Sequence, residues 1–127
     1  MKVLVLGKGE LKEKEINNTL EELQKIVEGY IEIPFLSKKF NDNGIDVIIN
    51  EEGKLIDGMN PEIAVVSKEH GNILDVVYGN CIFASHNDDG DTVELNEEQI
   101  AIVEKELETT AGLMMGDKNY FVRVLFI

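Results

Sequence analysis

The sequence predicts a single α+β domain in which two main helices pack on a mixed or antiparallel β-sheet. Three observations carry this prediction. Short β-prone runs recur from the first residues to the last, two segments place apolar residues at helical spacing, and turn-forming residues separate these segments. The chain has 127 residues, 43% of them hydrophobic, which fits one domain with a hydrophobic core of its own.

The first strand is predicted at residues 3–6, where the run Val-Leu-Val-Leu ends at a glycine. The apolar stretch at the N-terminus is too short for a signal-peptide core or a membrane span, and no other apolar run approaches that length. Residues 7–16 mix charges with glycine, so we interpret them as a connection with a short strand near Ile16.

The first helix is predicted to begin after Asn18, a good N-cap, with Glu21 at the capping-box spacing. Its apolar stripe comprises Leu20, Leu23, Ile26 and Val27. Gly29 is predicted to follow the helix in the left-handed conformation, which costs glycine little. Residues 30–33 then alternate into a strand that Pro34 limits.

The middle of the chain is predicted to be mostly strands and turns. Residues 37–44 are interpreted as a polar loop, residues 45–49 as a strand, and residues 50–56 as a hairpin turn and exit with Gly53 at positive φ. Residues 62–66 fit either a short helix or a strand. Residues 76–84 form the longest β-favouring run, in which Gly79-Asn80 predicts a bulge or a kink.

The second helix is predicted after Asn96, an N-cap with Gln99 at the capping-box position. Its buried stripe comprises Ile100, Val103 and Leu107, and its solvent face comprises Glu97, Glu98, Glu104 and Glu108. Residues 120–127 are β-prone and mostly apolar. Such a tail requires burial, so it pairs either inside the sheet of its own domain or with another copy of the chain.

The charge narrows the classes of partner. Twenty-five acidic residues against twelve basic ones give a net charge of −13, which repels nucleic acid and anionic membranes. We therefore expect no direct nucleic-acid or membrane partner. Cationic protein surfaces, metal ions and a small ligand in a locally different pocket remain open. The single cysteine excludes an intrachain disulfide and suits a reducing cytoplasm.

No motif predicts catalysis, a metal site or a cofactor. The Gly7–Gly9 segment lacks the remaining residues of a Walker or dinucleotide fingerprint, which favours a simple strand-ending turn. The loop 86–91 lacks the terminal carboxylates of a calcium loop and is interpreted as a solvated acidic turn. Cys81, His70 and His86 match no zinc spacing. The sequence therefore favours a non-enzymatic protein.

Three separated stretches carry a resemblance to a known family: INNTLEELQKIVEGYIE at residues 16–32, NEEGKL at 50–55 followed by Asn60-Pro61, and LNEEQI at 95–100. Together they resemble a small uncharacterised family of domains of unknown function found in bacteriophages, plasmids and bacterial genomes. The resemblance covers residues 1–108 as a family-like α+β domain. Residues 109–127 form a C-terminal extension that ends in a strand and offers an oligomer interface.

The resemblance implies an accessory protein of a phage or mobile element, acting in the cytoplasm of a bacterial host cell. The first expectation is a homo-oligomeric sponge that sequesters a nucleotide-derived immune signal. Its ligand contacts would come from the cations Lys8, Lys38, Lys39, Lys54 and Arg123 and from the aromatic residues Tyr30, Phe40 and Tyr78. The alternative is an acidic inhibitor or DNA mimic that occupies a cationic, nucleic-acid-binding host protein.

Overall fold

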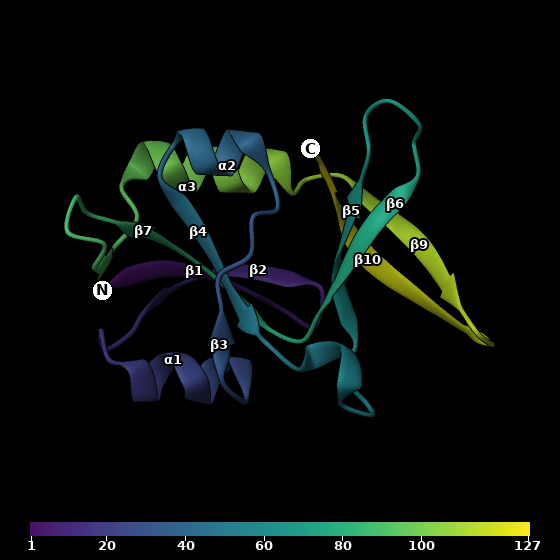
Figure 1. The fold of residues 1–127 in the computed structure, drawn as a ribbon, viewed down its shortest axis with the longest axis horizontal. Coiled ribbons are helices and arrows are strands. Elements are labelled where there is room, and N and C mark those ends of the chain that lie inside the picture. Colours follow the sequence, from purple (N-terminus) through teal and green to yellow (C-terminus); the bar gives the residue numbers. More distant parts are fainter.

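The computed structural model describes all residues from Met1 to Ile127 and contains two β-sheets (Figure 1). The first sheet is antiparallel and has the strand order β2-β1-β7-β4-β3, with β8 paired to β7. Its strands are β1 (Lys2–Gly7), β2 (Glu10–Glu15), β3 (Ile31–Glu32), β4 (Ile45–Asn50), β7 (Cys81–His86) and β8 (Thr92–Val93).

The second sheet has the order β6-β5-β10-β9 and is mixed. Its strands are β5 (Pro61–Val66), β6 (Ile73–Tyr78), β9 (Thr110–Met115) and β10 (Lys118–Phe126). Strand β10 pairs with β5 in parallel and with β9 in antiparallel orientation. The α+β class is confirmed, but the predicted single sheet is wrong. Because β10 pairs with β5 and β9 of the same chain, the apolar tail pairs inside the sheet of its own domain.

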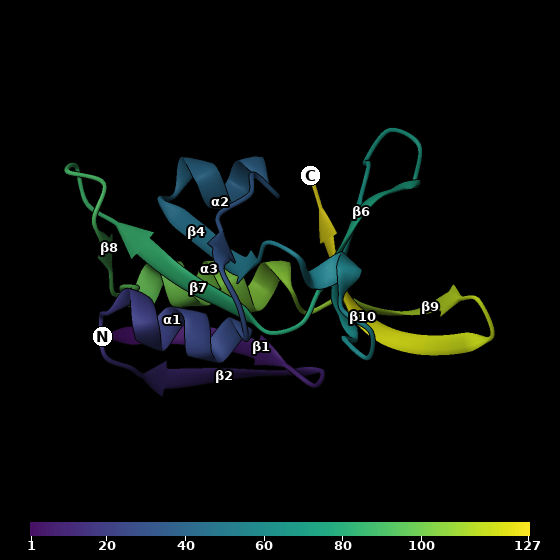
Figure 2. The ribbon, with the colours of Figure 1, turned by 60° about the horizontal axis from the view of Figure 1, so that its bottom comes forward.

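Three helices are present where two main ones were predicted: α1 (Leu20–Val27), α2 (Lys38–Asp42) and α3 (Glu97–Glu106). A short 3-10 helix, η1 (Gly53–Leu55), precedes β5. Helix α1 covers one face of the first sheet, and α2 and α3 cover the other (Figures 1 and 2). The domain is mainly β, because all three helices are short.

Two apolar cores follow from this layering. The smaller core lies between α1 and the first sheet and includes Leu23, Val27 and Ile82. The larger core lies under α2 and α3 and continues into the second sheet through Ile63 and Leu125. Because one core touches both sheets, the second sheet packs against the first as part of the same hydrophobic unit.

The ends of α1 differ from the prediction. Thr19, not Asn18, is the N-cap, and its hydroxyl accepts the N–H of Glu22 at 3.2 Å. The left-handed residue is Glu28 (φ 64°), not Gly29. Glycine at position 29 is explained by a close approach instead, since a Cβ there would lie 2.5 Å from Nδ2 of Asn50. Position 29 therefore requires glycine because of packing against Asn50, not because of a left-handed conformation.

Four further expectations are corrected or resolved. Residues 38–42 form helix α2 inside the expected loop, and Gly53 begins η1 without positive φ, so no hairpin forms there. Residues 62–66 are strand. The run 76–84 is divided at Gly79 (φ 77°) into strands of different sheets, a stronger break than a kink. Residues 10–15 are a full strand within the predicted connection.

The second helix follows the sequence closely. Asn96 and Gln99 form a capping box, with contacts of 2.8 Å and 3.0 Å between each side chain and the other residue's N–H. Val103 and Leu107 are fully buried, as the stripe predicted. Local capping and spacing were therefore sufficient to predict this helix.

Candidate functional site

Strand β2 places its lysine side chains on one face of the first sheet and Glu13 on the other. Successive side chains of a strand point to opposite faces. Lys12 and Lys14 therefore face the α1 side, where they line a groove, whereas Leu11 and Glu13 face the α3 side. The alternating sequence Glu-Leu-Lys-Glu-Lys-Glu thus gives an acidic protein one locally basic surface and one strongly acidic surface.

The basic groove lies between α1 and the β1–β2 hairpin and has a volume of about 430 Å³. We call it the lysine groove and define it by Lys8, Lys12, Lys14 and Lys25. Lys12 pairs with Glu10 at 2.9 Å, and this hydrogen bond lowers the pKa of Glu10. The other three lysines have no carboxylate within 4.0 Å, although Glu22 and Glu28 also line the groove. Three ammonium groups are therefore free to meet an anion.

Two side-chain amides, from the buried Asn50 and the half-buried Asn80, fix the helix side of the groove. Nδ2 of Asn50 donates to the carbonyls of Val27 and Glu28, both at 3.1 Å, and Nδ2 of Asn80 donates to Ile26 at 2.9 Å. These bonds satisfy carbonyls at the C-terminus of α1, which otherwise lack partners. Lys25 lies in the last turn, where the helix dipole favours a cation.

The turn that carries Lys8 is fixed from inside the protein. Lys8 and Gly9 both have positive φ, and their N–H groups donate to the two carboxylate oxygens of Glu62, each at 3.1 Å. Glu62 is only 5% exposed, and burial raises its pKa against the opposing effect of these two donors. The two N–H groups that this turn could offer to an anionic ligand are therefore already bonded to Glu62.

Arg123 holds the same turn from the second sheet. Its guanidinium donates to the carbonyl of Gly9 at 3.0 Å and to that of Leu107 at 2.9 Å. Arg123 therefore has a structural role and lies outside the lysine groove. Glu62 and Arg123 together connect the β1–β2 hairpin to both β5 and β10, across the junction between the sheets.

The structure does not bring the eight predicted ligand residues together. Lys54 and Tyr78 line a separate pocket of about 210 Å³, where Lys54 is paired with Asp75 and where Glu32, Glu51 and Glu52 also contribute. That pocket is acidic and unsuited to an anion. Tyr30 is 68% exposed and lines neither pocket.

The α2 residues also leave the predicted site. Lys38 pairs with Asp42 at 2.7 Å on the exposed side of the helix, and Lys39 is exposed beside it. Phe40 is 2% exposed and makes an edge-to-face contact with Phe83, with ring centres 5.9 Å apart. The prediction that Phe40 stacks a ligand base is wrong, because the ring belongs to the core.

Lys12, Lys14 and Lys25 were not predicted as site residues. The signal for the first two is the charge alternation of residues 12–15. Such a charged segment favours a solvated connection in the sequence, whereas the structure has a strand there. Lys25 could be placed on α1, yet which strand α1 faces depends on long-range packing. Of the eight predicted ligand residues, only Lys8 lies in the lysine groove.

Other chemically capable side chains lie apart from this groove. His86 contacts Asp46 at 3.0 Å, His70 lies beside Glu69, and no group of three potential metal ligands occurs. Cys81 is fully buried, and burial raises the pKa of its thiol far above the ordinary value. In the loop 86–91, Oδ1 of Asn87 accepts the N–H groups of Asp89 and Asp91.

These features define a small two-sheet α+β domain with a basic groove on an acidic surface. Residues 1–108 match the model of the family described as domain of unknown function DUF3846, and the chain belongs to that family. No curated protein and no solved structure matches the chain. None of the three helices is long and apolar enough to cross a membrane.

Proposed function

We propose that this chain is a small non-enzymatic accessory protein of a phage or mobile element that sequesters a nucleotide-derived immune signal in the bacterial cytoplasm. The lysine groove is the observation that carries the ligand-binding part of this proposal. The genetic setting rests on the family resemblance seen in the sequence. A ligand with several phosphates suits the groove, because it can contact more than one free ammonium group at once.

The net charge of −13 is compatible with such a ligand. Exposed charges more than about 8 Å away are largely screened at physiological ionic strength. A phosphate inside the groove instead meets lysines at contact distance, where charge-assisted hydrogen bonds form. The acidic remainder of the surface slows the approach of anions but does not cancel these local contacts.

Titration calorimetry with a panel of cyclic dinucleotides and cyclic ADP-ribose isomers tests the proposal. We expect heat from at least one member, and loss of that heat in the double variant K14E/K25E. The matched control is K38E/K39E, which changes the net charge equally at exposed lysines outside the groove. Absence of binding to every member, or equal losses in both variants, would refute it.

A second variant leaves the net charge unchanged, so that a loss of binding cannot be attributed to net charge. The quadruple exchange K12E/E13K/K14E/E15K keeps composition and net charge but moves the lysines of β2 to the α3 side. Binding in the lysine groove predicts that this variant loses the ligand while unfolding at a similar temperature. Retained binding would place the ligand elsewhere.

The acidic-inhibitor alternative has one specific observation in its favour. Glu97 and Glu104 of α3, Glu108 just beyond the end of this helix and Glu13 of β2 line a groove of about 680 Å³. At the helical rise of 1.5 Å per residue, Glu97 and Glu104 are separated by about 10 Å along the helix axis. This cluster of four carboxylates in one groove supports contact with a cationic surface of a host protein.

A lysine-rich peptide serves as the probe for this alternative. Salt-sensitive binding that is lost in E97Q/E104Q/E108Q, but kept in E51Q/E52Q/E69Q, would favour the acidic inhibitor over the sponge. The control variant neutralises the same number of exposed carboxylates away from α3. Equal effects of both variants would indicate that only the total charge matters.

A further inference from the structure

The outer strands of the two sheets are β2, β3 and the two-residue β8 in the first and β6 and β9 in the second. An edge strand presents unpaired N–H and C=O groups, and proteins usually protect it with charges, proline, bulges or short length. Strand β2 is charged at every position except Leu11. Strand β3 is two residues long, and Pro34 follows closely.

Strand β6 is protected in another way. Asp75 lies in its middle, and the N–H of Val76 donates to the Asp75 carboxylate at 2.8 Å. Its register with β5 is also irregular at two places. A regular ladder with a further strand is therefore disfavoured at this edge.

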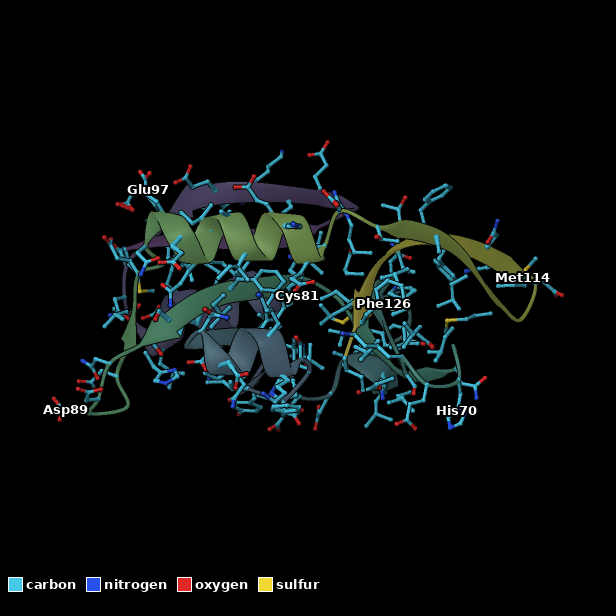
Figure 3. The ribbon with its side chains drawn as sticks, turned by 90° about the horizontal axis from the view of Figure 1, so that it is seen from above. His70, Cys81, Asp89, Glu97, Met114 and Phe126 are labelled. Carbon is cyan, nitrogen blue, oxygen red and sulfur yellow. The ribbon has the colours of Figure 1, made fainter.

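Strand β9 has none of these protections. Its sequence, Thr-Ala-Gly-Leu-Met-Met, contains no charge and no proline, in a chain with 29% charged residues. Its six residues pair with β10 without a register shift. Met114 is 67% exposed, and Phe121, which pairs with Gly112 across the hairpin, is 76% exposed. Figure 3 shows Met114 at the end of the molecule opposite Glu97.

The hydrogen-bond pattern shows which groups of β9 point outward. The N–H of Val124 donates to the carbonyl of Thr109 at 2.8 Å. Hydrogen-bonded and non-hydrogen-bonded pairs alternate along an antiparallel ladder. The register therefore directs the N–H and C=O groups of Thr110, Gly112 and Met114 away from β10.

We propose that β9 is a homodimerisation edge, at which two copies of the chain pair their β9 strands in antiparallel orientation. A two-fold axis at Gly112 pairs Thr110 of each copy with Met114 of the other, and all outward groups are then satisfied. The same patch meets itself, as an isologous dimer requires. The second sheets of the two copies then join into one continuous sheet, with the exposed Phe121 ring of each copy on the same face.

The low number of charges around β9 favours pairing of two copies at this edge over pairing at the other edges. Residues 109–127 carry only Asp117, Lys118 and Arg123, whereas the whole chain carries a net charge of −13. Two copies that meet through β9 keep their acidic surfaces far apart, which lowers their mutual repulsion. The lysine groove lies on the first sheet, so this inference stands independently of the proposed ligand.

Sedimentation equilibrium of the full chain over a range of concentrations tests the dimer. Met114→Pro removes an outward N–H but no bond to β10, and proline is tolerated on an edge strand at such a position. We expect this variant to weaken dimerisation at least about tenfold. Met114→Val keeps the N–H and serves as the matched control, expected to dimerise like the natural chain. Circular dichroism checks that both variants fold.

A second variant tests the register directly. In the proposed dimer, two copies of Gly112→Cys face each other as a hydrogen-bonded pair with Cα atoms about 5.5 Å apart, within disulfide range. Because Cys81 is buried, the introduced thiol is the accessible one. Oxidation is expected to cross-link Gly112→Cys but not Lys118→Cys. A chain that is monomeric throughout, a dimer unaffected by Met114→Pro, or equal cross-linking of both cysteine variants would overturn the proposal.

Discussion

The close approach of Gly29 and Asn50 predicts that one substitution changes sign with its background. A Cβ on residue 29 would lie 2.5 Å from Nδ2 of Asn50, nearer than real Cβ contacts come. Asn50 is 4% exposed and is held by three hydrogen bonds, two to the end of α1 and one from the N–H of Glu52. Gly29→Ala must therefore displace this buried amide from its hydrogen bonds to the end of α1.

The magnitude follows from those bonds. Each contributes a net of about 1 kcal/mol, so Asn50→Ala is expected to destabilise the fold by about 3 kcal/mol. Gly29→Ala forces out the two bonds from Nδ2 and is expected to cost about 2 kcal/mol in the natural background. In the Asn50→Ala background the obstruction is gone. Since φ of residue 29 is not positive, alanine there then stabilises by about 0.4–1 kcal/mol through the unfolded chain.

Urea unfolding of the natural chain, both single variants and the double variant measures this coupling. The expected interaction energy is about 2–3 kcal/mol, with the double variant more stable than Asn50→Ala alone. Constant m-values would show that the unfolded states are comparable. If Gly29→Ala costs the same in both backgrounds, the contact with Asn50 does not explain the glycine.

Three further predictions concern single substitutions. Because the folded pKa of Glu62 is raised above its ordinary value of 4.5, stability is expected to fall as pH rises from that value through the folded pKa; Glu62→Gln should lack this dependence in pH-dependent unfolding. Phe40→Ala should cost about 3–5 kcal/mol in denaturant unfolding, whereas a base-stacking surface ring would cost little. Asn96→Ala should remove the α3 capping box at a cost of about 1 kcal/mol, measured in the same way.

The parts of the fold that were predictable are those that neighbouring residues decide. The α3 capping box and its buried stripe depend on residues within a few positions of one another, so Asn96, Gln99 and Val103 could be interpreted correctly. The division into two sheets depends instead on which partner each strand finds. Gly79 signals a break, but nothing local states that the strands on either side join different sheets.

The candidate site was less predictable for the same reason. Phe40 lies in a polar stretch, and its burial depends on Phe83, far along the chain. The lysine groove combines a hairpin turn, an edge strand and the end of a helix, three elements whose proximity is purely tertiary. Residue type predicted which side chains were able to bind an anion, but not which of them converge.

The composition of the lysine groove limits what its ligand can offer. Tyr30 and Tyr78 lie outside the groove, Phe40 is buried, and the groove's apolar residues are Val5 and Ile26, so no aromatic ring is available to stack a base. Binding energy must therefore come mainly from the phosphates, and affinity should follow phosphate charge more closely than base identity. A sponge built in this way would accept a class of signals that share a phosphate arrangement. A strong preference for one base among ligands of equal charge would instead require a base-contacting surface supplied from outside the groove.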